Sequence, residues 1–139
     1  MILMRLPFCM VPVDKWVAFN APLPKDKHRI IIIKKIFDEV QFFYVTSQVD
    51  NAKRVLRYDL GCIAELGKSD WESLTADKSC VQCDKRHLGT VKLDVLESMY
   101  NDGKLEYIGE VPDVVKTRIK SAICSSKSFT DIEKKFYSL

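Results

Sequence analysis

The residues best suited to chemistry stand at the ends of two apolar runs. Arg29 directly precedes an isoleucine-rich run, and a second run ends in Thr46, Ser47 and Gln48. The guanidinium of an arginine is a planar fork of donors that matches two phosphate oxygens, and it stays charged at any working pH. A hydroxyl adds a further donor, and a glutamine amide can bind a base edge or a ribose 2′-OH. This set suits RNA cleavage without a metal, in which the neighbouring 2′-OH attacks the phosphorus. The alternative is that Arg29 is a solvated charge and Thr46 an ordinary strand residue.

Two strands must position these residues. Ile30 to Ile36 is an almost unbroken β-branched run, which is typical of a strand covered on both faces. A turn at Asp38 and Glu39 leads into "VQFFYVTSQ", which we interpret as the antiparallel return strand. The pairing of these two strands is expected to bring Arg29 and residues 46–48 to the same end of a hairpin.

Basic residues gather on both sides of this hairpin end. They are Lys25, Lys27, Lys53, Arg54 and Arg57. Such a cluster is often just a solvated rim, but here it coincides with the hydroxyl and guanidinium groups, which favours a bound phosphate backbone. His28, beside Arg29, is a candidate general base near neutral pH, or else a loop histidine without a catalytic role.

Composition bounds the class of protein. The chain has 139 residues, 47% of them hydrophobic and 29% charged, which is typical of one soluble globular domain with a real core. The net charge of +3 permits a local nucleic-acid patch but does not argue for one. Five cysteines, an odd number, indicate a reducing, cytoplasmic compartment rather than a disulfide framework. No run is long enough for a membrane span, and the N-terminus lacks the features of a signal peptide.

The order of the expected elements is strands first and helices later. A short strand over 16–19 precedes the hairpin, and a shorter strand around 57–66 is interrupted by Gly61. Three amphipathic helices follow: one stopped by Gly103, one with Pro112 at its first position, and one capped by Ser128. Their predicted apolar faces are Leu93, Leu96 and Tyr100; Val115, Ile119, Ala122 and Ile123; and Phe129, Ile132 and Phe136. This order predicts an α+β fold, a strongly bent antiparallel sheet or barrel with helices at one side.

A possible metal site occurs in "SCVQCDKRH". Cys80, Cys83 and His87 have a spacing that zinc ligands adopt, and Cys62 or His28 could supply a fourth ligand. If the segment is a strand, however, Cys80 and Cys83 point to opposite faces. We therefore interpret the cysteines as free buried thiols and predict neither a metal nor a cofactor.

Aromatic residues near the hairpin have two possible roles. They could stack on RNA bases, or they could form the core. Strand alternation places most of them in the core. The residues are Trp16, Phe19, Phe42, Phe43 and Tyr44.

Three segments resemble one known family. They are "KWVAFNAPLPKDKHRIIIIKK", "FFYVTSQVDNAKR" and "DKSCVQCDKRHLGTVKLDVLESMYNDGKLEYIGEVPDVVKTRIKSAI". In this order they are similar to the MazF/PemK family of toxin ribonucleases, small SH3-like barrels that cut single-stranded RNA. The similarity covers about residues 13–124 of a single domain, 1–139, with 125–139 as an additional C-terminal helix.

The resemblance implies roles for particular residues. Arg29 would be the catalytic arginine and Thr46 its hydroxyl partner. Gln48 would contact the RNA. Together with the hydroxyl and basic residues singled out above, the predicted substrate-binding residues are Lys27, His28, Ser47, Gln48, Lys53 and Arg54. The family also implies a metal-independent endoribonuclease, a 2′,3′-cyclic phosphate product, a cognate antitoxin and a homodimer.

The chain departs from the family around the arginine. "DKHRII" has neither the glycine nor the proline of the family pattern, and Asn20 replaces an acidic residue. A second hypothesis is therefore a non-catalytic module on the same barrel that binds nucleic acid or a peptide. A third is a zinc-stabilised interaction domain built on Cys80, Cys83 and His87.

Overall fold

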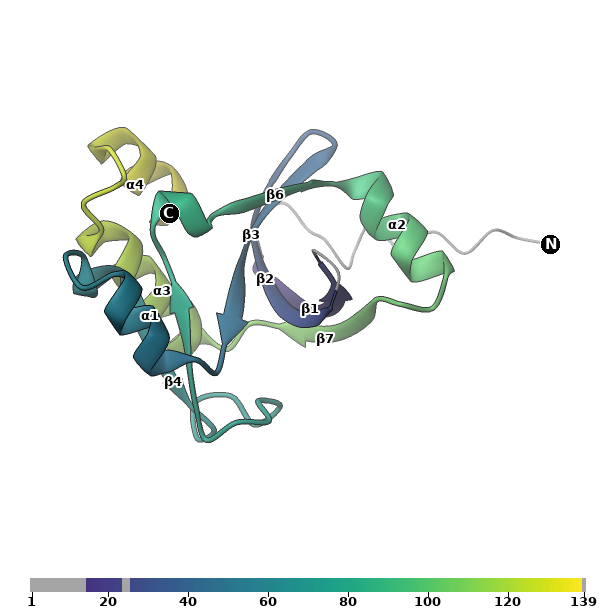
Figure 1. The fold of residues 1–139 in the computed structure, drawn as a ribbon. Coiled ribbons are helices and arrows are strands. Elements are labelled where there is room, and N and C mark those ends of the chain that lie inside the picture. The colour runs from purple at the N-terminus through teal and green to yellow at the C-terminus, as the bar shows by residue number, and fades with distance from the viewer. Residues whose placement is uncertain (1–14, 24–25, 139) are drawn as a thin grey trace. The chain divides into compact units, whose positions relative to one another are not determined.

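The predicted α+β class is confirmed. The computed structural model describes residues 15–23 and 26–138, which form antiparallel strands and α-helices (Figure 1). The strands are β1 (Val17–Pro22), β2 (Lys27–Ile36), β3 (Glu39–Thr46), β4 (Ile63–Gly67), β5 (Lys78–Gln82), β6 (Gly89–Lys92) and β7 (Glu106–Glu110). The helices are α1 (Val49–Val55), α2 (Leu93–Asn101), α3 (Asp113–Ser125) and α4 (Asp131–Ser138).

The strands form one sheet in the order β4-β5-β3-β2-β1-β7, with β6 also paired to β3. This order is open, with β4 and β7 as its edges, so the SH3-like barrel is not confirmed and stays a prediction. Within the described ranges, no helix is long and apolar enough to cross a membrane.

The chain divides into two compact units. The first comprises residues up to Phe42 together with Gly89–Val111, and the second comprises Phe43–Leu88 together with the residues from Pro112 onward. Strand β3 begins in the first unit and ends in the second.

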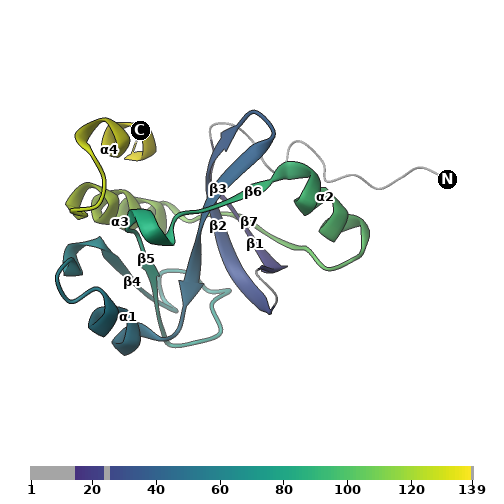
Figure 2. The same cartoon turned by 45° about the horizontal axis from the view of Figure 1, so that its top comes forward.

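In the first unit, β1 lies between β2 and β7 and pairs with both in antiparallel fashion. Residues Ile30 to Ile33 of β2 are all buried, which confirms the prediction of a strand covered on both faces. The first half of β3 pairs with β6, and β6 leads directly into α2 (Figure 2). Helix α2 buries Leu96, and Gly103 stops the helix as predicted, with a positive φ of 71°.

In the second unit, the end of β3 pairs with β5, and β5 pairs with β4. Helix α1 packs on β4 and β5, α3 packs on β4, and α4 packs on α3. The predicted apolar face of α3 is confirmed, because all four of its members are buried.

Four local predictions are wrong. The return strand ends at Thr46, and Gln48 is the residue that precedes α1. Gly61 lies in a 3-10 turn before β4 rather than inside a strand. Pro112 stands one residue before the first residue of α3. Thr130, not Ser128, caps α4: its Oγ1 accepts from the Glu133 backbone, while the Glu133 carboxylate accepts from the Thr130 backbone.

The predicted apolar face of α4 is confirmed at one residue and wrong at two. Phe129 is buried, whereas Ile132 is 81% exposed and Phe136 is 42% exposed. Tyr137 is buried instead, with its ring 5.6 Å from that of Phe129. The helix therefore packs through Tyr137 against Phe129, which precedes it.

Candidate functional site

Arg29 belongs to a polar cluster that crosses three neighbouring strands of the first unit. Asn20 on β1 is the cross-strand partner of both Arg29 on β2 and Glu106 on β7. Residues directly opposite one another share a face of the sheet, and Lys27, two residues before Arg29, lies on that face too. We call Asn20, Lys27, Arg29 and Glu106 the Arg29 cluster.

Hydrogen bonds and an ion pair connect the Arg29 cluster. Arg29 Nε donates to Asn20 Oδ1 over 2.9 Å, and Asn20 Nδ2 donates to Glu106 Oε1 over 2.6 Å. Lys27 Nζ lies 3.5 Å from the same Glu106 oxygen. Asn20 therefore fixes the orientation of the guanidinium by its carbonyl and that of the carboxylate by its amide.

The electrostatics of the Arg29 cluster favour an anion. Burial lowers the pKa of Arg29, and the charge of Glu106 opposes that shift, so the guanidinium stays protonated at neutral pH. The Asn20 hydrogen bond, helped by Lys27, lowers the pKa of Glu106 and keeps the carboxylate ionised. Two positive charges thus face one negative charge, and the side chains of Lys27 and Glu106 are more than half exposed. The cluster can receive a phosphate from solvent.

Three of the predicted binding residues line one pocket of the second unit. The pocket has a volume of about 270 Å³ and lies where β3 passes into α1. Its lining is polar: Ser47, Gln48, Val49, Asp50, Asn51, Lys53, Glu65 and Lys78. We call it the α1 pocket. The structure therefore brings Ser47, Gln48 and Lys53 together.

Thr46 lies at the end of β3, immediately before these residues, and pairs with Cys80 of β5. Its Oγ1 accepts a hydrogen bond of 3.1 Å from the Gln48 backbone amide. The oxygen is thereby oriented, and the hydroxyl proton remains available for donation.

The predicted basic residues have partners within their own units. Lys53 Nζ lies 3.1 Å from Glu65 Oε1, and Arg54 donates to the Asn51 side chain. Exposed ion pairs of this kind contribute about 0–1 kcal/mol, so the cations can turn to a bound phosphate at little cost. His28 is exposed on β2, and Lys25 lies outside the described residues.

The prediction that most aromatic residues near the hairpin belong to the core is confirmed. Phe19 and Phe43 are fully buried, and Trp16 and Phe42 are almost so, while Tyr44 is partly buried. None of the four buried rings is accessible to a base.

The weak zinc candidates do not form a metal site. Cys80 lies in an apolar cluster with Val49 and Ala52, and the Cys83 thiol donates to the Val81 carbonyl. His87 Nδ1 contacts the carboxylate of Asp84. Among the residues that the structure describes, no group of three His, Cys, Asp or Glu side chains could hold a metal ion. The arrangement of these side chains therefore does not support the hypothesis of a zinc-stabilised domain.

The described thiols of this region are buried and protonated. Burial raises the pKa of Cys62 to about 12 and that of Cys80 to about 11. Burial also raises the pKa of Cys83 well above its usual value. These cysteines serve as small core residues, as predicted from the sequence.

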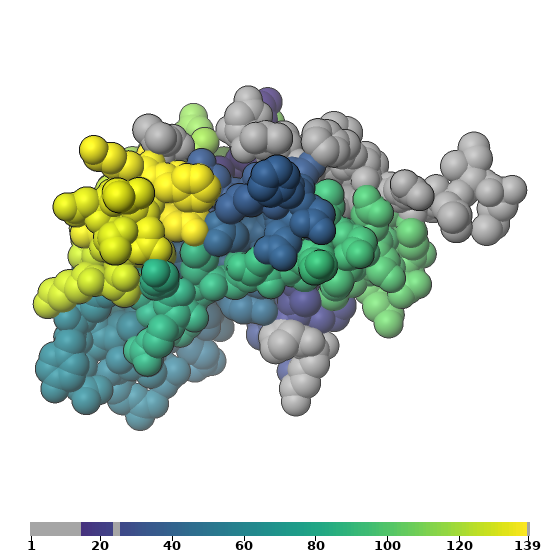
Figure 3. All heavy atoms as spheres, turned by 90° about the horizontal axis from the view of Figure 1, so that it is seen from above, coloured from purple at the N-terminus to yellow at the C-terminus, as the bar shows by residue number. Residues whose placement is uncertain are grey.

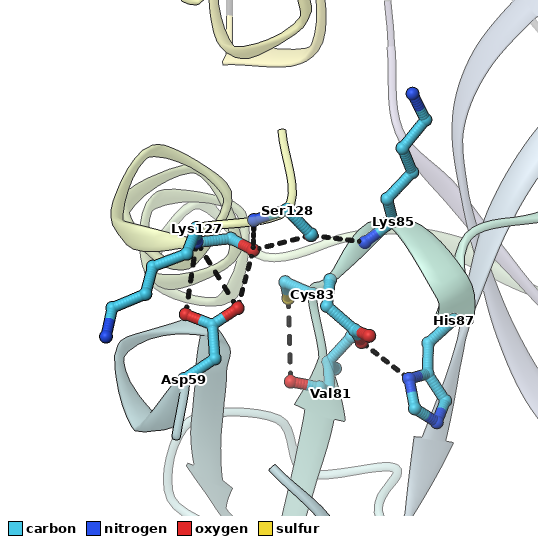
Figure 4. Close-up of polar contacts among 9 residues, drawn as sticks. Asp59, Val81, Cys83, Lys85, His87, Lys127 and Ser128 are labelled. Atoms are coloured by element: carbon cyan, nitrogen blue, oxygen red, sulfur yellow. Dashed lines mark hydrogen bonds and ion pairs between the residues drawn. The ribbon is translucent and has the colours of Figure 1, made fainter. Parts of the chain in front are cut away.

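A polar network around the buried Ser126 joins α3 and α4 to the rest of the second unit (Figure 4). The Asp59 carboxylate accepts from Ser126 Oγ over 3.0 Å and from the Lys127 backbone over 3.1 Å. Ser128 Oγ lies 2.8 Å from Ser126 Oγ and accepts a 2.8 Å hydrogen bond from the Lys85 backbone. Ser126 is fully buried, so the network satisfies polar groups that would otherwise destabilise the fold.

The proposed catalytic pair falls in different units. Arg29 belongs to the first unit, with Lys27, and Thr46 belongs to the second, with the α1 pocket. Sequence reasoning missed Glu106, because its β7 strand meets β1 through a pairing between residues 86 positions apart. It also missed helix α1, whose buried residues Val49 and Ala52 have helical spacing with the buried Leu56 that follows the helix.

No protein-family model matches the chain, and no curated protein or solved structure is significantly similar to it.

Proposed function

We propose that the chain is a metal-independent endoribonuclease that cleaves single-stranded RNA. The Arg29 cluster carries this proposal, because it combines an oriented guanidinium, an ionised carboxylate and a second cation on one exposed face. Phosphodiester cleavage by an adjacent 2′-OH needs charge stabilisation and proton transfer, and these groups supply both. The sequence resemblance to the MazF/PemK toxins points to the same chemistry.

In the proposed reaction, the 2′ oxygen forms a bond to phosphorus and the bond from phosphorus to the 5′ oxygen breaks. The 2′-OH proton passes to a carboxylate, for which Glu106 is the candidate, and a proton from Lys27 or water ends on the 5′ oxygen. Arg29 stabilises the negative charge on the phosphorus-bound oxygens. The products are a 2′,3′-cyclic phosphate and a 5′-OH.

Thr46 and the α1 pocket complete the proposal. Within the second unit, the oriented Thr46 hydroxyl would donate to a phosphate of the RNA, and Ser47, Gln48 and Lys53 would hold a nucleotide. The cysteine content adds a cytoplasmic location, and the resemblance adds a cognate antitoxin and a homodimer. Light scattering that gives the mass of a monomer at the working concentration would overturn the homodimer.

The test is cleavage of unstructured RNAs in EDTA by the wild type, Arg29→Ala and Arg29→Lys. We expect cyclic-phosphate ends from the wild type and a loss of about a hundredfold or more in Arg29→Ala, because a preorganised donor is worth that much. Arg29→Lys keeps the charge but not the fork, so we expect intermediate activity. Arg86→Ala, which removes an exposed arginine elsewhere, serves as the matched control.

Cleavage that needs a divalent metal, or that survives Arg29→Ala, would overturn the mechanism. A second candidate is a non-catalytic binding module, favoured by the missing glycine and proline in "DKHRII" and by the bond that already occupies Arg29 Nε. Folded wild-type protein that binds these RNAs without cutting them would establish the module instead.

A further inference from the structure

Tyr58 presents an aromatic ring to solvent just after α1. The residue is 77% exposed, although an aromatic ring gains stability by burial. Arg57 Cζ lies 4.7 Å from the centroid of the ring, and Arg57 Nη1 donates to the Arg54 carbonyl over 3.2 Å. The guanidinium is therefore anchored over one face of the ring, and the exposure of Tyr58 leaves the opposite face to solvent.

Further cations lie close to Tyr58 in the chain or contact its backbone. Lys53 and Arg54 occupy the last turn of α1, and Lys127 Nζ donates to the Tyr58 carbonyl over 3.1 Å. The neighbouring carboxylate, Asp59, accepts from the Lys127 backbone, as Figure 4 shows, and from Ser126 Oγ. We call Lys53, Arg54, Arg57, Tyr58 and Lys127 the Tyr58 surface. All its members belong to the second unit.

We propose that the Tyr58 surface binds single-stranded RNA, with an unpaired base stacked on Tyr58 and the adjoining phosphates on Arg57 and Lys127. An exposed aromatic ring among cations suits a single strand, because its bases offer free faces and its backbone offers regular negative charge. A duplex has no free base face inside its stack. An acidic peptide would use the cations but would leave the Tyr58 ring without a role. The choice of RNA rests on the proposed function; the stacking contact rests on the geometry.

The contact is measured with a 2′-O-methyl RNA of about twelve nucleotides, within the usual range for such sites, which cannot be cleaved because it lacks the nucleophile. Fluorescence anisotropy then reports binding alone. We expect Tyr58→Ala to weaken binding by roughly 5- to 100-fold, the usual value of one stacked base. Tyr58→Phe keeps the ring and is expected to bind within about twofold of the wild type. Phe37→Ala, which removes a more exposed ring in the first unit, is the matched control.

Salt dependence tests the phosphate contacts. A single strand releases about 0.7 counterion per neutralised phosphate, so Arg57→Ala and Lys127→Ala should each reduce the slope of log affinity against log salt by about 0.7. Tyr58→Ala removes no charge and should leave this slope unchanged. A slope that falls equally in all three variants would mean that the segment has lost its structure, which circular dichroism would also detect, and would overturn the stacking contact.

The outcomes separate this contact from the proposed catalysis. Equal affinity of Tyr58→Ala and Tyr58→Phe overturns the stacking contact, whether or not ordinary RNA is cut. Binding that depends on Tyr58, in a protein that cuts no RNA, keeps the contact and removes the nuclease. Poly-glutamate that competes equally well with RNA, in the wild type and in Tyr58→Ala, would identify an acidic polypeptide as the ligand and would overturn the RNA proposal.

Discussion

Arg29 and Asn20 are cross-strand partners joined by a side-chain hydrogen bond of 2.9 Å. The same asparagine donates to Glu106, so one neutral side chain separates a guanidinium from a carboxylate while it orients both. A carboxylate in place of Asn20 would neutralise Arg29 directly. The asparagine instead carries no charge, so the Arg29 cluster keeps a net positive charge.

The first prediction concerns pH. The pKa of Glu106 is lowered in the folded protein, so its contribution to stability is present above the ordinary carboxyl pKa and is lost as the pH falls through the folded pKa. Glu106→Gln should therefore be less stable than the wild type near about pH 7, and this difference should be smaller near about pH 3, below the ordinary carboxyl pKa. Urea midpoints at both pH values measure this. Glu72→Gln, at an exposed site, is the control. A difference that is constant with pH would mean that the Glu106 charge does not stabilise the fold.

The second prediction separates the two roles of Thr46. Thr46→Val removes the oxygen that accepts from the Gln48 amide and the proton available to a phosphate, whereas Thr46→Ser keeps both. If the hydroxyl acts on the phosphate, kcat should fall by about tenfold or more in Thr46→Val and remain near wild type in Thr46→Ser. Rates are measured with saturating RNA in EDTA. Equal kcat values in both variants would assign Thr46 a local structural role.

The third prediction rests on the close approach of Gly89 to Phe42. These residues are paired between β6 and β3, and a Cβ at Gly89 would lie 2.5 Å from Cζ of the buried Phe42 ring. Gly89→Ala should lower the free energy of unfolding by about 1–3 kcal/mol, the usual cost of overpacking. At Gly67 the nearest atom would be 3.6 Å away, so Gly67→Ala is the control. Equal urea midpoints for the two variants would show that the Phe42 ring moves aside without a loss of stability.

Residue spacing in the sequence predicted those parts of the fold that depend on the pattern of apolar residues within one element. The buried run in β2 and the apolar face of α3 follow from residue spacing, and both are confirmed. Helix α1 was not predicted, because it has only seven residues and lacks a side-chain cap that would mark its start. The face of α4 was wrong because Tyr137, which carries a polar hydroxyl, packs against Phe129 in place of Ile132. Tertiary contact selected that face, not hydrophobicity alone.

The candidate site shows the same division. Arg29 was found because it precedes an isoleucine-rich run, although β2 itself begins at Lys27. Ser47, Gln48 and Lys53 were found because they follow an apolar run, and these three do share a pocket. Glu106 and Asn20 join Arg29 through pairings of β1 with two other strands, and sequence spacing does not encode such long-range register. The contact between Arg57 and Tyr58 could have been predicted from the sequence, since the two residues are adjacent. The exposure of the Tyr58 ring could not.

The fourth prediction concerns the tip of the β2–β3 hairpin, which lies on the face shown in Figure 3. Phe37 has a positive φ of 54° and is 93% exposed. This backbone conformation disfavours a bulky residue, whereas asparagine tolerates it. Phe37→Asn should raise the free energy of unfolding by about 0.5–1 kcal/mol, while Phe37→Ala, which keeps the strained backbone, should not. Equal stabilities of the two variants by urea unfolding would show that the strain is not released at this position.

The fifth prediction concerns the buried thiols. Because burial raises the pKa of Cys62 to about 12 and that of Cys80 to about 11, the unfolded chain loses these protons at lower pH than the folded protein does. Their contribution to stability is fully present below the ordinary thiol pKa of about 8.5, and it should decline as the pH rises toward the folded values. Urea midpoints of the wild type and of Cys80→Ala between about pH 7 and pH 10 measure this decline, which should be smaller in the variant.

Alkylation provides an independent test of the same thiols. Iodoacetamide reacts with the thiolate, so Cys62, Cys80 and Cys83 should remain unmodified in the native protein and react once urea unfolds it. Cys124, exposed on α3, should react in the native state and serves as the internal control. Peptide mass spectrometry assigns each site. Rapid modification of Cys80 in the native protein would show that α1, which covers it with Val49 and Ala52, opens readily. The residues of the α1 pocket would then move with the helix, and the affinity for RNA would include the cost of ordering it.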